Sequence, residues 1–92
     1  MDKKILKEMI ENDKKIFDLF LELYGLLISV RTKNRVGLSE KYIQEEREDL
    51  ESETSKIVQV LSEKNTPCTS EEINNFTLEW GEGQFNWLKK GH

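Results

Sequence analysis

Six carboxylates gather within nine residues near the middle of the chain, and they are the first side chains that could do chemistry. They are Glu45, Glu46, Glu48, Asp49, Glu51 and Glu53. Carboxylates three or four residues apart share one face of a helix and can hold Mg²⁺ for hydrolysis. The spacing Glu46-x-x-Asp49 supplies one such pair, but the next pair, Glu8-x-x-Glu11, lies far upstream. The pattern therefore favours a solvated helix face and no metal site.

Three cations at alternate positions follow an apolar segment: Arg31, Lys33 and Arg35. Cations are favoured at the C-terminal end of a helix, and the same groups can bind a phosphate or an acidic partner. Tyr24 lies two turns earlier and could stack on a base, and Lys89 adds a cation near the C-terminus. We expect these five residues to contact a phosphorylated small ligand or an acidic protein partner.

The chain lacks the side chains that nucleophilic catalysis needs. His92 is its one histidine and its last residue, and Cys68 lies beside Pro67 with no histidine near it in sequence. Gly81-x-Gly83 is too short to form a phosphate-binding loop. We expect no catalytic residue and no cofactor, so the protein is not expected to be an enzyme.

Large apolar side chains are the remaining candidates for function. Trp80 and Trp87 lie in a short aromatic C-terminal stretch, and tryptophan is favoured both in cores and at interaction hot spots. Phe20 and Leu27 belong to the most apolar segment of the chain, residues 16–30. We predict that these four residues contribute to an interface.

Residues 2–33 are predicted to form one long central helix. Ile16, Phe20, Leu23 and Leu27 follow the spacing of a heptad seam, with Asp13 filling an earlier position of it. A second apolar row widens this face, so one other amphipathic helix cannot cover it. The segment is too short and too charged to span a bilayer.

Three further helices are expected at about residues 39–64, 69–80 and 82–90. Ser39 is a good N-cap for the first of them, and Pro67 follows its end. Thr69 and Glu72 have the spacing of a capping box at the start of the next. Gly81 and Gly83 either end that helix or bend it, since glycine is unfavourable inside helices. We favour continuation with a bend, because the apolar face continues beyond them.

The 92 residues correspond to one domain, spanning residues 1–92, whose own core is marginal. The net charge of −4 disfavours a general nucleic-acid binder. One cysteine and the lack of a recognisable leader indicate a cytoplasmic protein. Alanine does not occur, which suggests an AT-rich coding genome and hence a bacterial or phage source.

The first half resembles the short helical chorismate mutases. The resemblance covers about 30 residues and rests on a long first helix followed by a basic turn, at Asp13, Ile16, Leu19, Lys33 and Gly37. It implies a mutase that holds its substrate with cations. The arginine that grips a substrate carboxylate in that family falls at Leu23, so the mutase would be a degenerate one.

The segment Glu82-Gly83-Gln84-Phe85-Asn86-Trp87-Leu88-Lys89 is similar to the end of the phage helical-hairpin sponges, which sequester cyclic-nucleotide immune signals. Those proteins carry a glycine, large apolar residues and a basic residue on a closing helix. The resemblance implies a small homo-oligomer without a catalytic site. A helical bundle of the bacteriocin-immunity type is a further alternative, by analogy of fold.

Together these features predict an all-α protein, a small three- or four-helix bundle that forms homo-oligomers. We expect a non-catalytic binding protein that acts as a regulator, an inhibitor or a ligand-sequestering counter-defence protein, with no membrane association. A chorismate-mutase-like enzyme would instead require two cations converging in one cavity. A metal-dependent nucleotide hydrolase would require a second pair of carboxylates around a metal.

Overall fold

The computed structural model describes residues 2–35 and 40–84, apart from the side chains of residues 33–35 and 42. These residues form four helices and no strand: α1 (Lys3–Asn12), α2 (Lys14–Arg35), α3 (Glu40–Glu63) and α4 (Ser70–Gln84). The predicted small all-α bundle is confirmed. None of the four helices combines the length and the apolar character needed to cross a bilayer.

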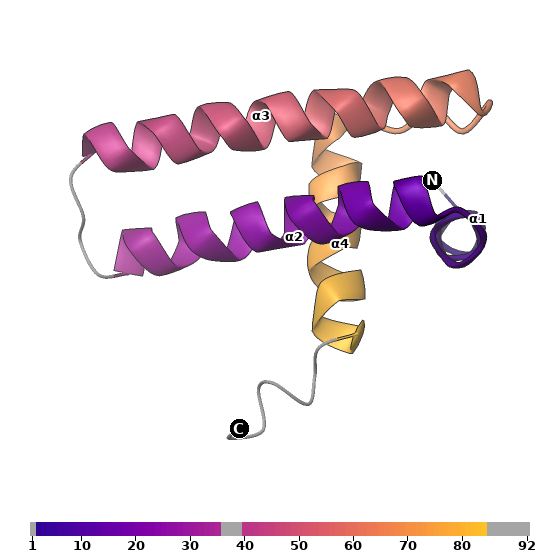
Figure 1. Ribbon diagram of the computed structural model, residues 1–92, viewed down its shortest axis with the longest axis horizontal. Helices are drawn as coiled ribbons and strands as arrows, with labels where there is room; N and C mark the ends of the chain where they lie inside the picture. The colour runs from indigo at the N-terminus through magenta and orange to yellow at the C-terminus, as the bar shows by residue number, and fades with distance from the viewer. Residues whose placement is uncertain (1, 36–39, 85–92) are drawn as a thin grey trace.

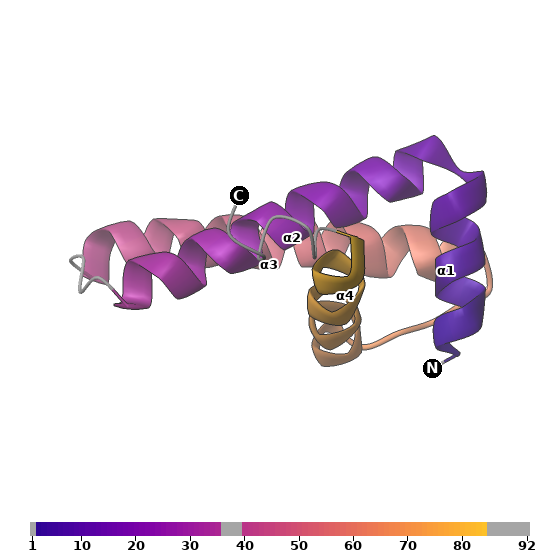
Figure 2. The same cartoon turned by 90° about the horizontal axis from the view of Figure 1, so that it is seen from below.

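The long helices α2 and α3 run side by side in opposite directions and form a hairpin (Figure 1). Helix α4 crosses both of them, and α1 lies across the end of α2 that is remote from the hairpin turn (Figures 1 and 2). The hairpin gives the molecule its longest dimension, and the described fold is elongated, with extents of 39 × 30 × 20 Å.

The prediction of one helix over residues 2–33 is wrong, because the chain bends at Asp13. This residue has extended backbone angles, φ −129° and ψ 109°. Its N–H donates to the Met9 carbonyl at 2.9 Å and so ends α1, while its Oδ1 accepts from the Lys15 N–H at 2.9 Å and so caps α2. A short carboxylate side chain can satisfy orphan N–H groups in this way, which makes Asp a favourable residue between two helices. The long central helix is therefore α2, and α1 is a separate element.

The core lies where α1, α2, α3 and α4 meet. Phe20 is fully buried at its centre, and its ring packs edge-on against Phe76 and Trp80, at centroid distances of 5.6 and 6.3 Å. Leu6 of α1 and Ile57 of α3 close the core on two further sides. All four helices thus contribute buried side chains to a single apolar cluster.

Helix α4 begins at the predicted capping box. The Glu72 N–H donates to Thr69 Oγ1 and the Thr69 N–H donates to Glu72 Oε1, both at 3.1 Å. Of the two alternatives at Gly81 and Gly83, the favoured continuation is confirmed, because α4 runs through both glycines to Gln84. A Cβ at Gly81 would overlap the ring of Tyr24, so this glycine allows α2 and α4 to approach closely.

The half of the hairpin nearest the turn is covered by neither α1 nor α4 (Figure 2). We call this half, residues 26–35 of α2 and 40–50 of α3, the arm. Leu26, Ile28 and Val30 are half-buried there. Among the described residues, none of these three belongs to the core cluster or packs against it. In the part of the chain that the structure describes, these three side chains therefore lie outside the core and keep part of their apolar surface exposed.

Candidate functional site

Two of the predicted ligand-binding residues lie where α2 crosses α4. The ring of Tyr24 packs against the backbone at Gly81. Arg31 Nη1 lies 3.9 Å from Glu82 Oε1, and about half of each of these side chains is exposed. Both residues therefore help to join the two helices, and Arg31 can reach an external anion only by leaving a loose ion pair.

The other three predicted ligand-binding residues have side chains outside the described set. Lys33 and Arg35 lie in the last turn of α2, but their side chains are outside the described set, and Lys89 lies beyond the described residues. The end of α2 that carries these cations is the end of the arm. Their role in binding a phosphate or an acidic partner remains a prediction.

The four residues predicted to form an interface have different positions. Phe20 and Trp80 lie in the core with 0% and 6% of their surfaces exposed, so the chain already covers them. Leu27 is half-buried and packs against the core. Trp87 lies outside the described residues. Leu26 and Ile28, which flank Leu27, are also half-buried but do not pack against the core.

The acidic cluster of α3 is mostly a solvated face. Glu45, Glu48, Asp49 and Glu51 are exposed, and Glu46 is half-buried. No group of three or more potential metal ligands forms in the part of the chain that the structure describes.

Glu53 differs from the rest of this cluster because it is only 7% exposed. Its Oε2 lies 3.5 Å from Lys56 Nζ, but its Oε1 is buried without a hydrogen-bond partner. An unsatisfied buried carboxylate oxygen costs stability. Glu53 is aimed into none of the pockets described here, so it marks a weak point in the hairpin and not a site.

The thiol of Cys68 is not an activated nucleophile. Burial, and then the neighbouring Glu72 carboxylate, raise its pKa above the ordinary value. The sulfur lies 3.5 Å from the Thr66 carbonyl oxygen, to which it donates. A raised pKa keeps the thiol protonated near neutral pH, and only the thiolate is a strong nucleophile.

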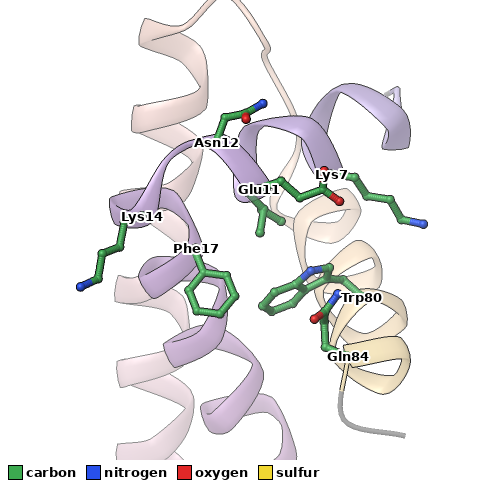
Figure 3. Close-up of a pocket in the computed structure, with 8 residues that line it drawn as sticks. Lys7, Glu11, Asn12, Lys14, Phe17, Trp80 and Gln84 are labelled. Atoms are coloured by element: carbon green, nitrogen blue, oxygen red, sulfur yellow. The ribbon is translucent and has the colours of Figure 1, made fainter.

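A surface pocket that the sequence did not indicate lies between α1, α2 and α4 (Figure 3). Its volume is about 580 Å³. Ile10, Phe17 and Trp80 form its apolar floor, and Phe17 meets Trp80 edge-on at a centroid distance of 5.8 Å. The surrounding polar residues are Lys7, Glu11, Asn12, Lys14 and Gln84.

A second hollow of about 480 Å³ adjoins this pocket and shares Lys7, Trp80 and Gln84 with it. It brings in Lys3 and Lys4 from the first turn of α1. We call the two hollows together the α1–α4 groove. The bend at Asp13 creates the groove, because it turns α1 so that it lies beside α4. The groove could not be predicted from a continuous helix over residues 2–33.

No protein family model matches the chain, and comparisons with curated proteins and with solved structures found no match. The site must therefore be interpreted from its own residues.

Proposed function

We propose that this chain is a small non-catalytic binding protein, acting as a regulator, an inhibitor or a ligand-sequestering protein, and that it works as a homo-oligomer. The observation that carries this proposal is the arm. Its residues Leu26 and Ile28 are half-buried and do not pack against the core cluster, and α1 and α4 lie toward the other half of the hairpin (Figure 2). A second copy packed on the arm would remove this apolar surface from water, at about 25 cal/mol per Å².

The charges of the arm favour a second copy as the covering partner. The last turn of α2 is basic, with Arg31, Lys33 and Arg35, whereas the neighbouring part of α3 exposes Glu45, Glu48 and Asp49. Two arms laid antiparallel bring the basic end of one copy near the acidic stretch of the other. An arrangement of this kind is self-complementary, as a two-fold interface requires.

The basic end of α2 is also the proposed place for a phosphorylated ligand or an acidic protein partner. Arg31 has a loose and half-exposed ion pair to Glu82, which an incoming phosphate could replace at small cost. In an oligomer, the cations of several arms could act on one ligand. This supports a sequestering role over catalysis.

The enzyme alternatives have less support. A mutase needs cations that converge in a cavity, but Lys7 and Lys14 point to opposite sides of the pocket in Figure 3. A metal-dependent hydrolase needs a second carboxylate pair facing the first, and the described residues hold no such cluster. A bundle of the bacteriocin-immunity type remains compatible with the fold, but no particular residue favours it.

Sedimentation equilibrium tests the proposal. We expect the wild-type protein to show a multiple of the 10.9 kDa chain mass, and a Leu26→Glu/Ile28→Glu double variant to sediment as a monomer. The two single variants then identify the flank of α2 that is in contact. Ile5→Glu is the matched control, since Ile5 is 44% exposed on α1, away from the arm, and should leave the mass unchanged.

A wild-type protein that stays monomeric at high concentration would remove the oligomer from the proposal. The ligand is tested separately by titration calorimetry with a panel of nucleotides, in which Arg31→Glu should abolish any binding seen. Binding that persists unchanged in this variant would place the ligand elsewhere.

A further inference from the structure

The α1–α4 groove carries a local excess of positive charge on an acidic protein. Four lysines line it, Lys3, Lys4, Lys7 and Lys14, against the carboxylates of Glu11 and Glu79. Lys3 Nζ is paired with Glu79 Oε2 at 2.8 Å, so these two charges balance. The remaining lysines outnumber Glu11, whereas the net charge of the whole chain is −4. The groove therefore favours an anionic partner.

The floor of the groove is suited to an apolar side chain and not to a stacked base. Trp80 is 6% exposed, and the rings of Phe17 and Phe20 lie against it with interplanar angles of 85° and 65°. A base needs an open aromatic face on which to stack. Ile10, Phe17 and the exposed edge of Trp80 instead form a small apolar surface on which a side chain can pack.

The positions of the lysines favour an extended partner over a compact one. Figure 3 shows the side chains of Lys7 and Lys14 directed to opposite sides of the pocket, away from Phe17 and Trp80 at its centre. One phosphate or carboxylate seated between the two rings cannot meet both ammonium groups. A chain that places its apolar group at the centre and separate anions on either side can.

We infer that the α1–α4 groove binds an acidic peptide segment of a partner protein, with one aliphatic or aromatic side chain seated on Ile10, Phe17 and Trp80. Carboxylates on either side of this anchor meet Lys7 and Lys14, with Lys4 further along the groove. The amide side chains of Asn12 and Gln84 lie at the rim and can bond the peptide backbone. This inference names the partner class for the binding role proposed above, but it uses a surface separate from the arm.

The test uses two short blocked peptides, each with a central phenylalanine. In the first peptide two glutamates flank the ring on each side, and in the second peptide lysines replace the glutamates. Fluorescence anisotropy of the labelled peptides measures affinity for the full chain. We expect the acidic peptide to bind, more weakly as salt is raised, and the basic peptide to show no saturable binding.

Charge reversal locates the peptide. Lys7→Glu and Lys14→Glu should each lower the affinity by about two- to fivefold, and the double variant by more, as expected for exposed ion pairs. Lys41→Glu is the matched control, because Lys41 is exposed on α3 at the opposite end of the molecule, and it should bind as the wild type does. Circular dichroism checks that the exposed substitutions leave the fold intact.

A second readout reports on the floor. The chain has two tryptophans, so Trp87→Phe leaves Trp80 as the single emitter, and its emission should shift on adding the acidic peptide. Equal binding of the two peptides, or unchanged affinity in the Lys7→Glu/Lys14→Glu variant, would overturn the inference. A Trp80 emission that changes with protein concentration alone would assign the groove to a second copy and also overturn it.

The two proposals fail separately. The Leu26→Glu/Ile28→Glu variant should lose self-association and still bind the acidic peptide with wild-type affinity. A wild-type protein that is monomeric but binds the peptide would refute the oligomer and support the groove. An oligomer that does not bind the peptide would support the proposed oligomer and refute the peptide site in the groove.

Discussion

The two ends of the α2–α3 hairpin are built from the same pair of helices but are stabilised differently. At the end near Asp13, α1 and α4 complete a core in which Leu6, Phe20 and Ile73 are fully buried. In the arm, within the described residues, α2 and α3 pack on each other with the loose Arg31–Glu82 ion pair to α4, and Leu26, Ile28 and Val30 stay half-buried. Helix α2 therefore contributes buried core residues at one end and half-buried apolar residues at the other.

This difference shows that apolar composition does not identify a core by itself. Residues 16–30 are apolar almost throughout, yet Ile16, Phe20 and Leu23 are buried in the core whereas no residue of 24–30 is buried. The position of α4 determines which of these apolar residues are buried. The following predictions test the contrast between the two ends.

The largest expected effect is at the centre of the core. Phe20→Ala should lower the free energy of unfolding by about 3–5 kcal/mol, since it leaves a cavity beside Phe76 and Trp80. Leu26→Ala in the arm should cost about 1 kcal/mol when the protein is dilute enough to be monomeric. Urea denaturation followed by circular dichroism measures both. Similar losses in the two variants would refute the contrast.

Glycine replacements give the next largest difference. Gly81→Ala should destabilise the fold by about 1–3 kcal/mol, because the new methyl group overlaps the ring of Tyr24 where α2 and α4 cross. Gly25 of α2 is exposed, and a Cβ added there has no atom within 4 Å. Gly25→Ala should therefore stabilise the fold by about 0.5–1 kcal/mol. Thermal melts of the two variants should therefore shift in opposite directions. A Gly81→Ala protein that melts at or above the wild-type temperature would show that the crossing is not tight.

The start of α4 gives a smaller effect. Thr69→Ala removes the acceptor for the Glu72 N–H and should cost about 1 kcal/mol.

The same cap adds a pH dependence. Hydrogen bonds from the backbone and side chain of Thr69 hold the pKa of Glu72 below its ordinary value of 4.5. The unfolded chain then binds the proton more readily, so this contribution is complete above pH 4.5 and is lost as the pH falls through the lower folded pKa. Glu72→Gln should lack this acid-dependent loss, as melts between neutral and acidic pH can show. An unchanged acid dependence would assign it to other groups.

The smallest effect belongs to the ion pair that joins the arm to α4. A double-mutant cycle of Arg31→Ala and Glu82→Ala should give a coupling below about 0.5 kcal/mol, because the pair is 3.9 Å apart and half-exposed. Added salt should remove it. A coupling several times larger would mean that Arg31 is committed to α4 and is unavailable to a ligand.

Local signals predicted much of the fold. The spacing of Thr69 and Glu72 gave the start of α4, and Pro67 gave the end of the preceding helix, since both depend on neighbours in sequence. Asp13 was misjudged because it occupies a heptad position, so the apolar period concealed its role as a cap. Asn12 and Asp13 together were the signal that could have revealed the break.

The site was less predictable than the fold. Phe20 was predicted to form an interface, whereas the chain itself buries it. Lys7, Phe17 and Trp80 lie on three different helices and meet only because the chain bends. Gly81 was interpreted only as a position that ends or bends the helix, because nothing local reveals the Tyr24 ring beside it. Features that depend on two helices crossing cannot be derived from the period of either helix alone.

The bend at Asp13 makes the topology sensitive to one half-buried residue between two helices. Most residues that determine a fold lie in its core, but this residue acts from a helix junction by directing the ten residues of α1 toward the bundle. A sequence lacking that carboxylate could extend α2 backwards as a straight rod, leaving Leu6 and Ile10 with nothing to enclose them. The rod would expose a further apolar strip to water, so a single lost cap would remove one of the four helices from the core.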